Sequence, residues 1–212
     1  MIKEMELRSG PKNPWHGQVS PDPGQPAEDQ FEVYAYACHQ AARVLRARTF
    51  RPAIYPNYDA YPILIMYRHA LELYLKGLVL AGAMYLHVIN RRRIDTKYVF
   101  KSHDIKRLAA DVVVIYKDVG WPVTFHGRGP RSAAAFAALV GNLTAIEGKS
   151  EGFRYPVDTS GSRAFKEGSG VQVLDLTRRL DPVLVGLDSA ITGLESKFNR
   201  AVKALRGVSQ ER

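Results

Sequence analysis

The sequence predicts an all-α fold, a bundle of about five helices in a single domain. Its 212 residues are enough for one domain with a sizeable core, and its 46% hydrophobic and 24% charged content is typical of a soluble globular protein. Long segments with helical patterning alternate with connections rich in proline and glycine. There is no internal repeat, and residues 151–166 indicate a small hairpin or extended insert around a TSGS turn.

The first residues of the chain differ from the rest. Five prolines lie between Pro11 and Pro26, where little helical periodicity is present, and the residue before a proline avoids the helical conformation. We therefore predict an extended or disordered N-terminal arm over residues 1–26. A single helical domain is expected to follow over residues 27–212.

The first two helices are indicated by their charges and their apolar residues. Residues 27–49 carry acidic side chains in the first turn and arginines in the last, which complements the helix dipole. The second helix is expected from about residue 61 to residue 90, and it is apolar nearly all round. Three arginines, residues 91–93, lie at or just past its end.

Three further helices complete the predicted bundle. The third begins near Ser102 or Asp104, either of which can cap it, and continues to about Asp118. The fourth is expected over residues 131–148, directly before the insert. The last extends from about 171 to 206 and contains one proline, which lies either near its start or at a kink.

The charge and cysteine content of the chain indicate which kind of partner and which cellular compartment to expect. The 30 basic residues outnumber the 21 acidic ones and give a net charge of +9, which favours a nucleic acid or a nucleotide as partner. The single cysteine, Cys38, excludes an intramolecular disulfide and a cysteine-based zinc cluster, and it fits a reducing cytoplasm. No signal peptide is indicated. We expect a cytoplasmic protein.

The longest apolar run, residues 60–88, does not predict a membrane span. Four ionisable side chains interrupt it, namely Arg68, His69, Glu72 and Lys76. Charged groups in the middle of a bilayer-spanning helix are costly. We therefore expect a buried core helix and no membrane partner.

The same four side chains occupy one stripe of that helix. At 100° per residue, Glu72 lies about 40° from Arg68, Lys76 lies about 80° from it, and His69 about 100°. Arg68 and Lys76 are each four residues from Glu72, so this carboxylate is the hub of two i,i+4 ion pairs. On a buried helix such charges either form an internal brace or line a pocket. The sequence leaves both interpretations open.

Other residues could join this stripe. His103 stands at the start of the third helix, where it either caps the helix or contributes to a site. If the second and third helices pack antiparallel, His103 is expected near the far end of the second helix. Arg154 and Tyr155 lie in the GFRYP segment of the insert, where an arginine is well presented to a carboxylate or phosphate. Alternatively, Arg154 pairs with a helix and Tyr155 fills the core.

Three short patterns in order resemble a group of bacterial proteins within the HEPN helical-bundle class. The patterns are RHxxELxLK on the second helix, HDIKRL at the third and FRYP before the last. Together they span roughly residues 60–160, about half of the chain. The residues that carry them are Arg68, His69, Glu72, Leu73, Leu75, Lys76, His103, Asp104, Leu108 and Phe153 to Pro156. The resemblance implies a helical bundle, frequent dimerisation and roles in toxin–antitoxin, abortive-infection and other antiphage systems.

One departure from this class bears on catalysis. Many HEPN members are metal-independent ribonucleases that carry an arginine followed, after four to six residues, by a histidine near the start of the last helix. None of the six histidines here has an arginine at that spacing, and the last helix has no histidine. Ribonuclease activity is therefore not implied by the resemblance.

The leading hypothesis is a HEPN-like module that binds RNA, a nucleotide or a partner protein. Its polar pocket would lie around Glu72 and Arg154, and Arg68, Lys76 and Tyr155 would be further ligand-binding residues. The net charge and the resemblance support this hypothesis, with a bacterial toxin, antiphage-defence or stress role as its setting.

A second hypothesis is a metal-independent endoribonuclease with a relocated catalytic set. His69 or His103 would be the general acid–base, since histidine titrates near neutral pH. Arg68, Lys76 and Arg154 would stabilise the negative charge of the transition state.

A third hypothesis is a structural or adaptor protein, in which the stripe is buried and every charge is paired internally. No histidine spacing typical of a metal site occurs, so we expect no metal ligands and no cofactor. We also expect a homodimer formed through the first or the last helix, although no residue identifies the interface.

Overall fold

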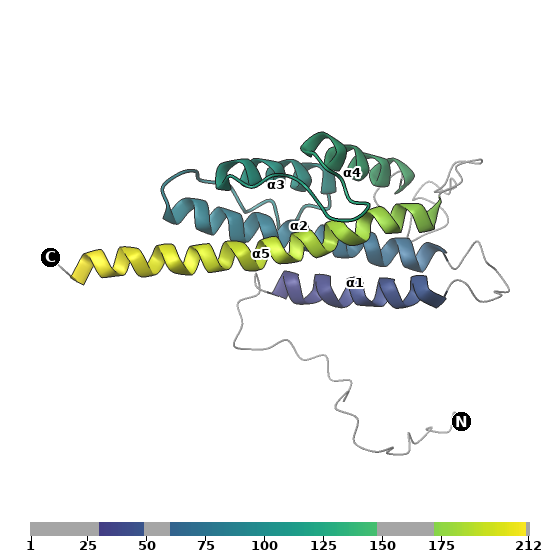
Figure 1. The fold of residues 1–212 in the computed structure, drawn as a ribbon, viewed down its shortest axis with the longest axis horizontal. Helices are drawn as coiled ribbons and strands as arrows, with labels where there is room; N and C mark the ends of the chain where they lie inside the picture. Colours follow the sequence, from purple (N-terminus) through teal and green to yellow (C-terminus); the bar gives the residue numbers. More distant parts are fainter. Residues whose placement is uncertain (1–29, 49–59, 148–171, 211–212) are drawn as a thin grey trace, which may run out of the picture.

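The computed structural model describes residues 30–48, 60–147 and 172–210, which form five helices without a strand in these ranges. The helices are α1 (Gln30–Arg48), α2 (Ala60–Val88), α3 (Ile105–Val119), α4 (Ala133–Glu147) and α5 (Val173–Gln210). They form three layers, with α1 on one side of α2 and α5, and with α3 and α4 on the other (Figure 1). The prediction of an all-α bundle is confirmed. The N-terminal arm and the insert at 151–166 lie outside the described residues.

Helix α2 is the centre of the bundle. It packs against α1, α3 and α5, and its buried residues point in every direction around its axis. By length and composition it could cross a bilayer, but 72% of its most apolar 18-residue window is buried inside the protein. A helix that is apolar all round and enclosed by other helices is typical of a protein core.

The start of α3 is defined by its cap. The side chain of Asp104 accepts hydrogen bonds from the backbone N–H groups of Lys106 and Arg107, so Asp104 is the N-cap. Ser102 instead accepts a hydrogen bond from the N–H of Asp104. Gly120 ends the helix at a positive φ of 77°, a conformation that glycine adopts without steric cost.

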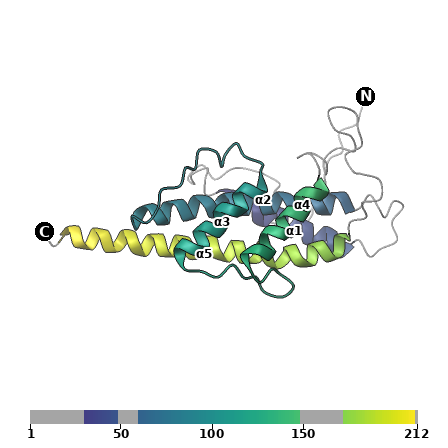
Figure 2. The same ribbon diagram turned by 90° about the horizontal axis from the view of Figure 1, so that it is seen from above.

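Helix α3 runs in the same sense as α2 and crosses it, so the antiparallel arrangement is wrong (Figure 2). The connection over residues 89–104 returns along α2 and places His103 beside Glu72, in the middle of that helix. The connection has to return from residue 88 to the level of residue 72, which is about 24 Å along a helix that rises 1.5 Å per residue. Sixteen residues span up to about 50 Å when extended, so the connection is long enough to return.

Gly82 of α2 permits close packing against Ile115, which lies further along α3. A Cβ atom placed on Gly82 would lie 2.7 Å from Cγ2 of Ile115, which is closer than real Cβ contacts allow. At Gly82 the two helices are therefore too close for any larger residue without a shift of Ile115.

Helix α5 is the longest element and passes along both α2 and α1. Its C-terminal part continues past the ends of the other helices (Figure 1). Pro182 lies inside the helix, ten residues from Val173 when both ends are counted, rather than near its start. Because proline has no backbone N–H, it cannot donate to the carbonyl of Arg178 four residues earlier.

Candidate functional site

The charge stripe of α2 forms one connected cluster around Glu72. Arg68 contacts one carboxylate oxygen, and Nζ of Lys76 lies 2.9 Å from the other. His103 is the residue before the N-cap of α3. Its Nδ1 atom lies 2.9 Å from the same carboxylate oxygen as Lys76, Oε1 of Glu72. An ionised carboxylate only accepts, so Nδ1 of His103 is the donor in this contact. The structure thus brings together four residues that the sequence singled out.

This cluster is closed to solvent except at His103. Arg68, Glu72 and Lys76 are 5%, 2% and 4% exposed, whereas the side chain of His103 is 62% exposed. Arg68 also donates to the backbone carbonyl of His103 over 3.0 Å. Nζ of Lys76 lies 5.8 Å from the ring centre of Phe31, in the first turn of α1. These contacts tie α2 to α1 and to the start of α3, as an internal brace does.

The carboxylate of Glu72 is held in its charged form. Burial by itself raises the pKa of this carboxyl, because the charged form is poorly solvated inside the protein. The hydrogen bond from Lys76 and the charge of Arg68 act in the opposite direction and outweigh burial, so the pKa of Glu72 is lowered. The ion pairs of the cluster are therefore formed at neutral pH.

The remaining sequence-derived site residues lie elsewhere. His69 is half-buried on the neighbouring face of α2, about 100° round the helix from Arg68. Arg154 and Tyr155 lie outside the described residues. Two cavities lined by described residues, of about 380 and 720 Å³, do not include Arg68, Glu72 or Lys76 in their lining.

A second polar cluster, centred on Asp181 of α5, was not anticipated from the sequence. Oδ1 of Asp181 accepts from Nε2 of His39 over 2.9 Å and from the hydroxyl of Tyr67 over 3.0 Å. Nε of Arg43 and a terminal nitrogen of Arg46 lie 3.6 Å and 3.9 Å from the same oxygen. Three helices, α1, α2 and α5, thus meet at one carboxylate.

A local signal for part of this cluster exists in α1. His39, Arg43 and Arg46 follow the spacing i, i+4 and i+7, which places them on one face of the helix. His39 is 2% exposed, so this face is directed into the bundle at its start. Their common partner is 142 residues away from His39, and no local pattern identifies it.

The environment of Asp181 also favours the charged carboxylate. Burial raises its pKa, but hydrogen bonds from His39 and Tyr67 and the charges of His39 and Arg43 lower it, and the lowering prevails. The pKa of the Tyr67 hydroxyl is raised, first by burial and then by the negative charge of Asp181. Tyr67 is therefore a neutral donor to Asp181 at physiological pH.

Asp181 lies at the wall of a cavity of about 720 Å³ between α1, α5 and the connection before α4. Three arginines line it, one from each of these segments: Arg46, Arg178 and Arg128. His126 lines it too. The cavity is therefore predominantly basic, with three guanidinium groups against one carboxylate.

The connection that carries Arg128 is fixed against the bundle by Phe125. This side chain is 2% exposed and packs against Phe136, with 5.3 Å between ring centres. Its ring also covers Gly186 of α5, where an added Cβ would lie 2.6 Å from Cδ1 of Phe125. A tight turn follows, with Gly127 at a positive φ of 56°. The turn places Arg128 next to α5, where a terminal guanidinium nitrogen of Arg128 lies 3.7 Å from Oδ1 of Asp175.

No group of three histidine, cysteine, aspartate or glutamate side chains within the described ranges is arranged to hold a metal ion. The chain matches no family model, no curated protein and no solved structure. The HEPN-like resemblance therefore stays a prediction that rests on the sequence patterns alone.

Proposed function

We propose that this protein binds RNA or a nucleotide through its phosphates, at the basic cavity between α1, α5 and residues 124–128. The observation that carries the proposal is the convergence of Arg46, Arg128 and Arg178 on one cavity. A guanidinium group offers several donors in one plane and binds phosphate oxygens in pairs. A volume of about 720 Å³ falls within the usual range for ligand sites, roughly 300–1,000 Å³.

The basic cavity suits a ligand better than the Glu72 cluster does, within the described part of the chain. The cations around Glu72 are buried and already paired with its carboxylate. Arg128 and Arg178 are exposed instead, so their donors reach solvent and an incoming phosphate. The net charge of +9 adds a long-range attraction for polyanions. A toxin–antitoxin or antiphage setting belongs to this proposal through the HEPN-like patterns.

The test is a charge reversal at the two exposed arginines, Arg128→Glu with Arg178→Glu, compared with Arg91→Glu with Arg93→Glu. Both double variants change the net charge equally, and Arg91 and Arg93 lie on the exposed turn after α2. Binding is measured by the fluorescence anisotropy of a labelled single-stranded 12-nucleotide RNA over a range of salt concentrations. Unlabelled RNA, ATP and inorganic phosphate serve as competitors and distinguish a strand from a mononucleotide.

The cavity variant is expected to weaken RNA binding by about 10- to 100-fold, which corresponds to roughly 1–3 kcal/mol. Its salt dependence is expected to become shallower by about 1.4 in log–log slope, because two phosphate contacts are lost. The Arg91 and Arg93 variant is expected to retain binding within about threefold, since distant surface charges are screened by salt. Equal losses in both variants would show general attraction to a basic protein and would contradict the proposed site.

A second candidate function, a metal-independent endoribonuclease, is supported by the geometry of His103. Its Nδ1 donates to the buried carboxylate of Glu72, which leaves Nε2 as the basic nitrogen of an exposed side chain. A carboxylate that orients an imidazole in this way is a common arrangement for a general base.

Cleavage of labelled RNA in the presence of EDTA tests this candidate. If His103 is the general base, His103→Gln is expected to slow cleavage by about 10²- to 10⁴-fold. The variant keeps the backbone carbonyl that accepts from Arg68, so the brace is retained. His87→Gln, at the exposed C-terminal end of α2 and away from the basic cavity, is the control and is expected to cleave at the wild-type rate. Equal cleavage rates for wild type and His103→Gln would exclude this function. The absence of cleavage by the wild type would exclude it too.

A further inference from the structure

The basic cavity contains a cationic donor that the bundle leaves unsatisfied. Nη1 of Arg46 is buried, yet it makes no hydrogen bond within the described part of the chain. Oδ1 of Asp181 lies 3.9 Å from this nitrogen, which is beyond hydrogen-bond distance. Most buried polar atoms in proteins have a hydrogen-bond partner. An exception on an arginine that lines a cavity therefore points to an acceptor that a ligand provides.

The guanidinium group of Arg46 is also free to turn toward such a ligand. Its central carbon lies 5.8 Å from the ring centre of Tyr67, and its nearest described carboxylate is that of Asp181. Neither contact is a hydrogen bond, so a small rotation of the side chain breaks none. The rotation brings two adjacent N–H donors to the cavity, an arrangement that binds a phosphate in a bidentate manner.

The three arginines of the cavity differ in their exposure. Arg178 is exposed, and the side chain of Arg128 is 67% exposed. The side chain of Arg46, in contrast, is 23% exposed. An incoming ligand therefore meets Arg128 and Arg178 first and reaches Arg46 deeper in the cavity.

This gradient of exposure favours a phosphate at the end of a molecule. An internal phosphodiester of RNA is attached to a sugar on both sides and carries one negative charge. A terminal phosphomonoester is attached on one side, has three free oxygens and carries a charge of about −1.5 to −2 at pH 7. It can pass the two exposed arginines and present its free oxygens to Arg46, with no second sugar to accommodate.

The charge of the cavity matches a phosphomonoester too. Among the described lining residues, three guanidinium groups against the one carboxylate of Asp181 leave two positive charges. Asp175 lies 3.7 Å from Arg128, but both side chains are more than half exposed, and such an ion pair contributes little. A group with two negative charges is therefore attracted more strongly than a diester with one.

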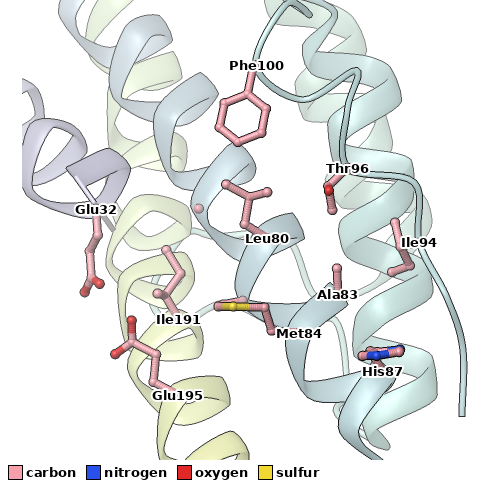
Figure 3. A pocket seen from close by; sticks show the side chains of 12 residues that line it. Glu32, Leu80, Ala83, Met84, His87, Ile94, Thr96, Phe100, Ile191 and Glu195 are labelled. Carbon is pink, nitrogen blue, oxygen red and sulfur yellow. The ribbon is translucent and has the colours of Figure 1, made fainter. Parts of the chain in front are cut away.

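This clustering of arginines is a local feature of one cavity. Figure 3 shows the cavity of about 380 Å³ along the C-terminal half of α2, whose described lining contains no lysine or arginine. Its acidic residues are Glu32 of α1 and Glu195 of α5. The net charge of +9 thus does not place arginines in every cavity of this protein.

We propose that the basic cavity selects a terminal phosphomonoester, at the end of an RNA strand or on a mononucleotide, over an internal phosphodiester. Arg128 and Arg178 bind phosphate oxygens at the entrance, and Arg46 donates from the interior. This inference rests on the proposed phosphate site and names the chemical group that the site prefers.

The test compares single-stranded 12-nucleotide RNAs of one sequence that differ only at their ends. The ends are a 5′-phosphate, a 3′-phosphate, a 5′-methyl phosphate and hydroxyl groups on both sides. Each RNA carries its fluorescent label on an internal base, and binding to the full chain is measured by anisotropy. We expect at least one phosphomonoester RNA to bind at least about tenfold more tightly than the methyl phosphate and hydroxyl RNAs. Competition by adenosine monophosphate distinguishes a mononucleotide from a strand end.

The variants Arg46→Gln and Arg43→Gln assign this preference to the cavity. Both remove one positive charge from the same face of α1, and both side chains lie beside Asp181. Of the two, only Arg46 is among the described residues that line the cavity. Arg46→Gln is expected to reduce the preference for the phosphomonoester by about tenfold. Arg43→Gln is expected to keep it within about threefold. Circular dichroism checks that both variants are folded.

The possible outcomes separate this inference from the proposed function. If the wild type binds all four RNAs equally, the preference for a phosphomonoester is overturned, whether or not the variants fold. The phosphate site itself still stands in that case if Arg128→Glu with Arg178→Glu weakens binding more than Arg91→Glu with Arg93→Glu. If these two double variants behave alike, the proposed function fails as well. A folded Arg46→Gln that keeps the full preference would overturn the role of Arg46.

Discussion

Replacing Glu72 by glutamine is expected to lower the free energy of unfolding by about 3–5 kcal/mol. Glutamine has the same shape but no charge, so the buried side chains of Arg68 and Lys76 would lose the carboxylate with which they pair. Chemical denaturation followed by far-ultraviolet circular dichroism measures the change. A loss below about 1 kcal/mol would mean that solvent or other groups satisfy these cations, and the cluster would not be an internal brace.

The matched control replaces the whole stripe: Arg68→Met, Glu72→Leu and Lys76→Met together. Because the triple variant removes the carboxylate together with both cations that pair with it, its free energy of unfolding is expected to be within about 2 kcal/mol of the wild type or above it. The comparison separates the cost of breaking the pairs from the net contribution of the pairs.

Acid titration of the same two proteins, wild type and Glu72→Gln, gives an independent signature. The pKa of Glu72 in the folded protein is lowered from 4.5, the value of the unperturbed group. The charged cluster therefore contributes its full stability above about pH 4.5 and loses it as the pH falls through the lower folded pKa. The stability difference between wild type and Glu72→Gln is thus expected to shrink in acid.

Replacing Asp181 by alanine is expected to have the second largest effect, a loss of about 2–4 kcal/mol in the free energy of unfolding. His39 and Tyr67 would then keep buried donors without their shared acceptor, at about 1–3 kcal/mol for each group. Asp181→Asn retains an acceptor oxygen and should lose less. Asp175→Ala, which changes an exposed carboxylate of the same helix, should stay within about 0.5 kcal/mol of the wild type.

The variant Asp181→Asn also tests the proposed phosphate site, where it is expected to strengthen binding although it lowers stability. Asp181 is the one carboxylate among the described residues that line the basic cavity. If phosphate binds beside it, Asp181→Asn should bind labelled RNA more tightly than the wild type, because a negative charge has been removed. Weaker RNA binding by a folded Asp181→Asn would argue against a phosphate in this cavity.

Local features of the sequence were sufficient to predict the helices. Asp104 could be proposed as a cap because capping depends on a side chain and the next two or three backbone N–H groups. The pairs Arg68–Glu72 and Glu72–Lys76 could be predicted for the same reason, since one turn of helix places residues i and i+4 side by side. These contacts follow from the period of the helix and require no knowledge of the fold.

The position of His103 required the tertiary structure. Sequence patterns indicated that a helix starts after it, but the path of residues 89–104 determines whether that helix runs with α2 or against it. Both paths are sterically possible for a connection of this length. The assumption of an antiparallel pair therefore placed His103 at the wrong end of α2.

The Asp181 cluster and the two cavities depend even more on long-range packing. The sequence determined that α1 presents His39, Arg43 and Arg46 on one face and that residue 72 carries the hub of a charge stripe, since both follow from 3.6 residues per turn. It could not determine that this face of α1 meets residue 181, because that contact depends on how three helices cross. Only the tertiary structure could place three distant arginines around one cavity and two distant glutamates around another.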